Sequence, residues 1–156
     1  HRLSLKAPEE DPVFQPTYFL FDWNGSKFSV FNCYELSNIK HRALFRGEVD
    51  FLLAVEWNKD TKYYSSIVES AARDLSAYIV QVNTSQYGDS RITSPQKSEV
   101  MNIVQISGGE NTTLLKGILN ITQLNDFRSK KPSPIDKRFK PTSAGFEHNK
   151  IREREA

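Results

Sequence analysis

The chain has 156 residues, of which 38% are hydrophobic, and a formal net charge of +2. This length favours a single domain with a sizeable core, and so small a net charge gives no argument for a nucleic-acid partner along the whole chain. The single cysteine excludes an internal disulfide. No apolar run is long enough for a membrane span and no signal-peptide pattern is present, so we expect a cytoplasmic protein without a membrane partner.

The first predicted elements are two strands joined by a tight turn. Residues 1–15 are polar and contain two prolines, and we predict no element there. Strand-forming residues fill 17–23, and 27–32 alternates apolar and polar residues, as a strand with one buried face does. Asn24-Gly25 lies between them and is a strong hairpin signal, because both residues tolerate positive φ. The second strand therefore ends where Cys33 begins.

A helix is predicted directly after this cysteine. Apolar residues at helical spacing continue until Gly47, which can end a helix in the left-handed conformation; they are Leu36, Ile39, Ala43 and Leu44. Cys33 would then lie at a strand-to-helix turn, where backbone N–H groups of the first turn lower the pKa of a thiol and bind an oxyanion. This position suits a nucleophile, although a lone cysteine is more often a small buried hydrophobe.

Two further strands and a second helix complete a β-α-β-α-β pattern. Residues 49–55 are almost continuously apolar, as in strands covered on both faces, and 77–82 predict another buried strand. The clearest helical periodicity in the chain is formed by Tyr64, Ile67, Val68, Ala71, Ala72 and Leu75. The right-handed crossover rule makes the strands of this pattern parallel neighbours. Shorter strands over 91–93, 99–106 and 113–121 predict a meander at the far side of the sheet.

The last part of the chain has a different composition. From Asp126 to Ala156 the hydrophobic pattern fades, and prolines, lysines and arginines accumulate. We therefore predict a compact part over 1–125 and a basic tail or arm over 126–156. The charged end, 150–155, could form a helix against a partner, but its composition favours a solvated tail.

Several stretches, in this order, resemble the nitrilase superfamily of carbon–nitrogen hydrolases over about residues 2–124. Residues 18–35 are similar to the family's hairpin that ends in a Cys-Tyr/Trp-Glu/Asp nucleophile motif. Residues 46–53 resemble its G-A-D-x-L strand and 71–73 its A-R-A helix, and 82–95 are similar to its N…G-x-S-x-I-x-x-P segment. Each likeness is weak alone, but together and in register they are fairly specific for the fold.

This resemblance implies an α/β fold, the nitrilase-like α-β-β-α sandwich, of which residues 1–125 would form the C-terminal half. It implies that Cys33 attacks the carbon of an amide or nitrile, that Glu moves protons, and that Lys and the Tyr34 N–H stabilise the tetrahedral intermediate. Glu9 or Glu10 would be the second Glu of the site. Lys6 fits the lysine poorly, and the first Glu would precede this chain, so we expect a piece of a longer protein.

The remaining expectations concern the pocket and the partners. Glu56, Trp57, Asn83 and Tyr34 would line the substrate pocket, and no cofactor is implied. We predict no metal site, because no His, Cys and carboxylate residues have metal-ligand spacing. The expected partners are a small-molecule amide or nitrile, the remainder of the longer chain and further copies in a homo-oligomer. Nucleic acid is expected only if the chain is part of a larger nucleic-acid enzyme.

One departure from the family pattern leaves a second interpretation open. Residues 37–41, Ser-Asn-Ile-Lys-His, replace the Arg and the Pro-Glu pair that commonly follow the nucleophile in the family. The entrance to the helix is therefore altered. The alternative to a hydrolase is a catalytically degenerate nitrilase-like module that serves assembly within a larger protein, such as a bacterial defence reverse transcriptase.

Overall fold

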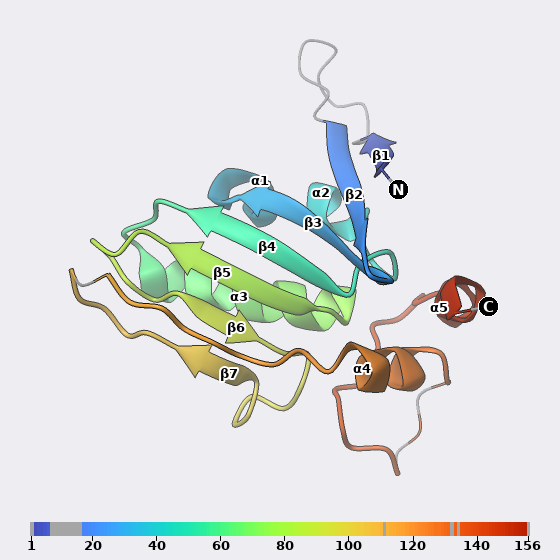
Figure 1. Ribbon diagram of the computed structural model, residues 1–156. Coiled ribbons are helices and arrows are strands. Elements are labelled where there is room, and N and C mark those ends of the chain that lie inside the picture. The colour runs from blue at the N-terminus through green and yellow to red at the C-terminus, as the bar shows by residue number, and fades with distance from the viewer. Residues whose placement is uncertain (1, 7–16, 111, 132, 134, 156) are drawn as a thin grey trace.

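A seven-stranded sheet forms the centre of the molecule (Figure 1). The computed structural model describes residues 2–6, 17–110, 112–131, 133 and 135–155. The strands lie side by side in chain order and are β1 (Arg2–Lys6), β2 (Thr17–Trp23), β3 (Ser26–Asn32), β4 (Phe51–Glu56), β5 (Tyr78–Asn83), β6 (Arg91–Thr93) and β7 (Asn102–Gln105). Strands β3, β4 and β5 are parallel neighbours, and the other pairs are antiparallel. The predicted parallel centre is confirmed, and so are two of the three strands of the predicted antiparallel meander, β6 and β7.

The hairpin of β2 and β3 turns where the sequence predicts. Asn24 and Gly25 have φ values of 51° and 79°, as the two central residues of a type I′ turn require. Strand β1, which the sequence did not predict, pairs antiparallel with β2 at the edge of the sheet. A polar segment carries no strand pattern of its own, so β1 depends on the neighbour with which it pairs.

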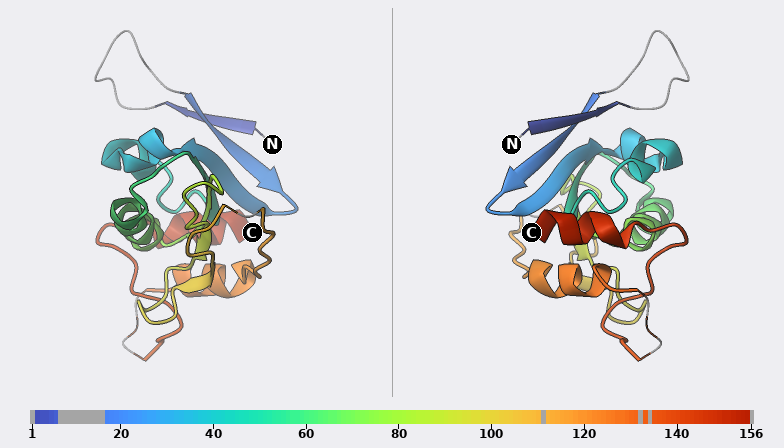
Figure 2. Two further views of the ribbon diagram at one scale, coloured as in Figure 1. Left: turned by 90° about the vertical axis from the view of Figure 1, so that its left-hand side faces the viewer. Right: turned by 90° about the vertical axis from the view of Figure 1, so that its right-hand side faces the viewer.

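Helices α1 (Cys33–Ser37), α2 (Ile39–Ala43) and α3 (Thr61–Leu75) cover one face of the sheet (Figure 2). The single helix predicted after Cys33 is two short helices, because Asn38 adopts an extended conformation and its side chain caps α2. Helix α3 begins after the capping residue Asp60 and ends at Ser76, which has a φ of 51°. Its buried side chains pack on those of β3 and β4 in one core that includes Phe31, Leu52, Ala54, Val68 and Leu75.

The opposite face of the parallel strands is partly open. Val30, Val55 and Val82 point away from the helices and are 42%, 55% and 51% exposed. The expectation that 49–55 is covered on both faces is therefore wrong for the described residues, because helices lie over one face of β4 only. Apolar strands without a cover indicate a surface that another structure can bury.

Helix α4 (Ile121–Arg128) and the segment before it cover the rest of this face. Buried side chains of α4 pack with Tyr78 and Phe139 in a second apolar cluster. Residues 112–120 form no strand, so the strand predicted over 113–121 is wrong. The segment instead crosses close to β6, where a Cβ atom on Gly117 would lie 2.7 Å from Ile92 Cδ1. Its apolar residues pack across the sheet rather than beside an edge strand.

The end of the chain packs against the amino ends of β4 and β5. Helix α5 (His148–Glu155) lies there, and its Ile151 is fully buried (Figure 1). Arg128 donates to the carbonyl oxygens of Val49 at 2.7 Å and of Ser76 at 3.1 Å, and it forms a buried ion pair with Asp50. The solvated tail expected over 150–155 is wrong, since Arg154 donates to Asp50 and Lys150 donates to Glu48, each at 2.8 Å. The domain boundary expected at residue 126 stays a prediction.

Candidate active site at the strand-to-helix turn

The chain bends at Cys33, as the sequence predicts. Strand β3 ends at Asn32 and α1 begins with Cys33, a free and half-buried cysteine. Asn32 Oδ1 accepts a hydrogen bond from Glu35 N at 2.9 Å, and Glu35 Oε2 accepts one from Asn32 N at 2.9 Å. This reciprocal capping box fixes the start of the helix. The backbone around the thiol is thereby held in one conformation.

Tyr64 on α3 holds the same turn from the other side. Its hydroxyl donates to the carbonyl oxygen of Cys33 at 2.5 Å, and the side chain is only 3% exposed. Burial raises the pKa of Tyr64 above its ordinary value, and the neighbouring Glu56 and Cys33 raise it further. The hydroxyl therefore stays protonated and remains a hydrogen-bond donor at neutral pH.

Replacing Tyr64 by Phe should lower the stability of the fold by about 0.5–1.5 kcal/mol, because the half-buried Cys33 carbonyl loses this hydrogen bond while the aromatic ring stays in place. Urea denaturation measures this change. Tyr63→Phe is the matched control, since Tyr63 is the preceding residue and is 64% exposed. Equal unfolding midpoints for the two variants would show that the Tyr64 hydroxyl contributes nothing to the turn.

Glu56 is the last residue of the neighbouring parallel strand β4, at the same edge of the sheet. Asn32 is in register with Val55, so the chain after β3 and the end of β4 lie side by side. Glu56 is 6% exposed, and its Oε2 accepts a hydrogen bond from Gln81 Nε2 at 2.9 Å. Burial raises the pKa of Glu56 to about 7, with the Gln81 bond lowering it, Asp89 raising it and Arg91 lowering it. A carboxyl group that titrates near neutrality thus lies beside the cysteine turn.

Asn83 lies at the end of β5, in register with Glu56. Its Oδ1 accepts hydrogen bonds from the N–H groups of Asn58 and Thr84, each at 3.0 Å. Its Nδ2 donates to the carbonyl oxygens of Asn58 at 2.8 Å and Gly88 at 2.9 Å. An amide offers two acceptor and two donor positions, so the side chain is fully used in joining two loops. Its expected role in lining a substrate pocket stays a prediction.

The other predicted site residues differ in how the structure places them. Tyr34 and Trp57 follow Cys33 and Glu56 directly and are 82% and 74% exposed. Glu9 and Glu10 lie outside the described residues. Lys6 is in backbone register with Thr17 at the start of β2. Tyr18, which follows Thr17 on β2, packs on Phe31 near the end of β3, with ring centroids 4.7 Å apart. The backbone of Lys6 therefore lies at the same end of the sheet as Cys33.

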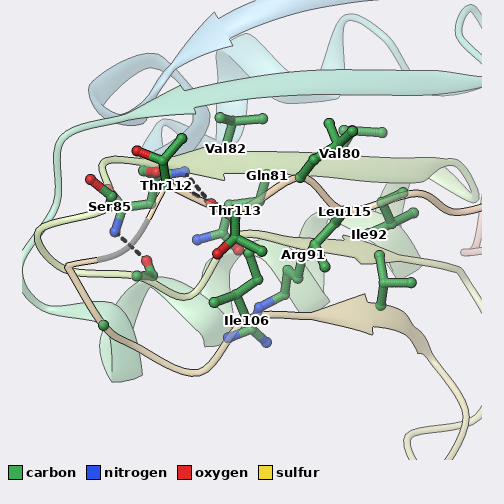
Figure 3. A pocket seen from close by; sticks show the side chains of 16 residues that line it. Val80, Gln81, Val82, Ser85, Arg91, Ile92, Ile106, Thr112, Thr113 and Leu115 are labelled. Carbon is green, nitrogen blue, oxygen red and sulfur yellow. Dashed lines mark hydrogen bonds between the residues drawn. The ribbon is translucent and has the colours of Figure 1, made fainter.

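A cavity of about 340 Å³ lies away from Cys33, on the open face of the sheet (Figure 3). Its walls are apolar side chains of β5, β6 and the segment after β7, which include Val80, Val82, Ile92, Ile106 and Leu115. Cys33 and Glu56 are not among its lining residues. We therefore assign it to the uncovered face of the sheet rather than to the cysteine turn.

Solved carbon–nitrogen hydrolases share this architecture. A CN-hydrolase superfamily protein from Xanthomonas campestris, with an arsenic adduct in its active site, matches with 16% identity and a TM-score of 0.56, over 72% of this chain and 47% of that chain. A mutant nitrilase-superfamily amidase from Nesterenkonia AN1 matches with 15% identity and a TM-score of 0.54, over 78% and 47%. The chain has the carbon–nitrogen hydrolase fold. A second mutant of that amidase, with the acetamide moiety of fluoroacetamide covalently added at its active site cysteine, matches with 12% identity and a TM-score of 0.50, over 65% and 40%.

The likeness concerns the fold and covers less than half of each of these carbon–nitrogen hydrolase chains. The sequence itself matches no protein-family model and no curated protein. Within the residues that the structure describes, no helix is long and apolar enough to cross a membrane. In the same residues, no three His, Cys, Asp or Glu side chains gather as a metal site.

Two residues next to the cysteine turn of this carbon–nitrogen hydrolase fold were not predicted as site residues. Tyr64 has an apolar ring that fits the buried face of α3, so its sequence pattern does not indicate that its hydroxyl binds Cys33. Gln81 is the polar residue within the apolar run 77–82. A polar side chain in a buried strand needs a partner, and this signal could have singled out Gln81.

Proposed function

We propose that the chain forms one half of a carbon–nitrogen hydrolase domain that cleaves a small-molecule amide or nitrile through Cys33. The observation that carries the proposal is the position of Cys33 in this fold. It is the first residue of α1, at the carboxyl end of a parallel strand, with its turn held by the capping box and by Tyr64. Solved structures with this fold include an amidase that reacts covalently at its active site cysteine.

The proposed reaction follows from the chemistry of the thiol. The Cys33 thiolate adds to the amide carbon, and the N–H of Tyr34 donates to the oxyanion that forms. The amine leaves after a carboxyl group protonates it, which gives a thioester, and water then hydrolyses the thioester to the acid. Glu9 or Glu10, together with a Glu and a Lys from the rest of the protein, would move the protons and stabilise the intermediate.

We further propose that the remainder of the longer chain covers the open face of the sheet. The apolar side chains there are Val30, Leu53, Val55, Val80 and Val82, on three neighbouring parallel strands. Parallel strands in proteins are usually covered on both faces, and their side chains are then apolar on both faces. The matched structures contain more than twice the matched length, which supports a second layer at this place.

We also propose that copies of the protein associate as a homo-oligomer.

A degenerate module is the second candidate function, and one observation favours it. The helix after Cys33 is interrupted at Asn38, so α1 has only five residues. A short first helix gives the thiol a weaker dipole than a long helix does. In this candidate the fold is kept for assembly, and Cys33 has ordinary thiol reactivity.

Fluoroacetamide distinguishes the two functions. In the full-length protein the Cys33 thiolate should displace fluoride and add the acetamide moiety, and peptide mass spectrometry locates the adduct. Iodoacetamide, a general thiol reagent, is the control for access to the thiol, and Cys33→Ser is the control for the site of addition. Labelling of Cys33 by iodoacetamide but not by fluoroacetamide would contradict the hydrolase and support the degenerate module.

A further inference from the structure

Glu56 and Gln81 form an isolated polar pair inside the fold. They lie at the carboxyl ends of β4 and β5 and are 6% and 1% exposed. Gln81 Nε2 donates to Glu56 Oε2 at 2.9 Å. The second oxygen of each group, Glu56 Oε1 and Gln81 Oε1, is buried and has no hydrogen-bond partner in the part of the chain that the structure describes. Each of these two side chains therefore has one buried acceptor oxygen without a hydrogen bond to any described residue.

A single proton would satisfy both oxygens. An ionised carboxylate and an amide oxygen can only accept hydrogen bonds, whereas a carboxylic acid donates from one oxygen and accepts at the other. A protonated Glu56 can therefore accept from Gln81 Nε2 and donate from Oε1 to Gln81 Oε1, which closes a ring of two hydrogen bonds. We propose that Glu56 is held as a neutral carboxylic acid paired with Gln81 in the folded protein, over a pH range in which an exposed carboxyl group is ionised.

The charged groups around Glu56 are compatible with a neutral acid. Arg91 is the nearby cation, but its guanidinium is bound to Asp89, donates to Ser65 Oγ at 2.8 Å and lies 3.8 Å from Glu69. No ion pair to Glu56 occurs among the described side chains. Asp89 adds a negative charge that disfavours a second carboxylate, and burial acts in the same direction. Gln81 and Arg91 lower the pKa of Glu56, so burial of the carboxyl group is the main effect that favours its protonated form.

The first test compares the stability of the full-length protein and its Glu56→Gln variant across pH 4 to 9. A carboxyl group whose pKa is raised from 4.5 to about 7 by folding binds more protons in the folded state between these values. The wild type should therefore lose stability relative to Glu56→Gln as the pH rises through this window, and the loss should level off only where the folded-state carboxyl group is fully ionised, well above pH 7. The variant lacks this dependence, because an amide–amide pair with Gln81 keeps both hydrogen bonds. Glu69→Gln, which removes a half-exposed carboxylate on α3, is the matched control and should keep the wild-type profile.

Parallel pH profiles for the wild type and Glu56→Gln would overturn the proposal. If the variant does not fold, an NMR titration of the Glu56 carboxyl carbon in the wild type decides instead: a midpoint near 7 supports the neutral acid, and a midpoint below 5 overturns it.

The measurement of stability against pH does not depend on catalysis. If Glu56→Gln removes the pH dependence but fluoroacetamide fails to label Cys33, the hydrolase function is contradicted while the acid–amide pair stands. If Cys33 is labelled but the profiles are parallel, the hydrolase function stands and the inference about Glu56 fails.

Discussion

The Cys33→Ala variant of the full-length protein is expected to lose amide or nitrile hydrolysis by roughly 10⁴- to 10⁶-fold, the range observed when a covalent nucleophile is removed. Cys33 is the only cysteine among these 156 residues, so within them no other thiol can form the thioester. Ammonia or amine release from small amides and nitriles measures the loss. Turnover that survives in Cys33→Ala would show that this thiol is not the nucleophile.

Two features of the turn make this experiment informative about chemistry rather than folding. Ala is a good helix former, and Cys33 is half-buried at the first position of α1, so the substitution leaves the capping box of Asn32 and Glu35 in place. Ser37→Ala is a matched control, since Ser37 is an exposed residue of the same helix. This control should retain turnover, and both variants should unfold at nearly the wild-type urea concentration.

Replacing Asp50 by Ala is expected to destabilise the fold by about 3–5 kcal/mol, the cost of breaking a buried ion pair by removing one partner. Asp50 is fully buried, and its carboxylate accepts hydrogen bonds from Arg128 at 2.5 Å, Arg154 at 2.8 Å and the Lys27 N–H at 2.8 Å. Its loss leaves two arginine side chains without their shared anion at the amino end of β4. Urea denaturation of the full-length protein measures the effect.

Asp136→Ala is the matched control for this prediction. Asp136 also pairs with an arginine, Arg138, but that pair lies in an exposed loop. Exposed ion pairs contribute little, so its unfolding midpoint should not change. Asp50→Ala should also make the chain after residue 128 more sensitive to limited proteolysis, because Arg128 and Arg154 hold that segment to the sheet. Equal midpoints for the two variants would contradict a structural role of the Asp50 cluster.

The predictions that were confirmed depend on short-range signals. Positive φ at Asn24 and Gly25 sets the hairpin, and the apolar spacing of 64–75 sets α3. The change from a two-residue to a helical period places the bend at Cys33. Each signal lies within about one element, so no distant contact is needed to interpret it.

The errors share a physical cause in long-range packing. The apolar residues of 113–121 resemble a strand, but they cross the sheet and find no edge to pair with. The basic composition of 126–156 predicts a tail or arm outside the core, but Arg128 and Arg154 bind Asp50, which lies 78 and 104 residues away in sequence. A charged residue does not reveal from sequence alone whether water or a buried partner neutralises it.

The sequence by itself therefore determined the hairpin of β2 and β3, the parallel strands β3 to β5, helix α3 and the bend at Cys33, because turn residues and hydrophobic periods act locally. Only the tertiary structure decided that Tyr64 binds the Cys33 carbonyl, that Glu56 pairs with Gln81, and that the described residues leave part of one face of the sheet uncovered. These features join residues 25 or more positions apart, or depend on what covers a surface, and such contacts are settled by packing and desolvation in the folded chain.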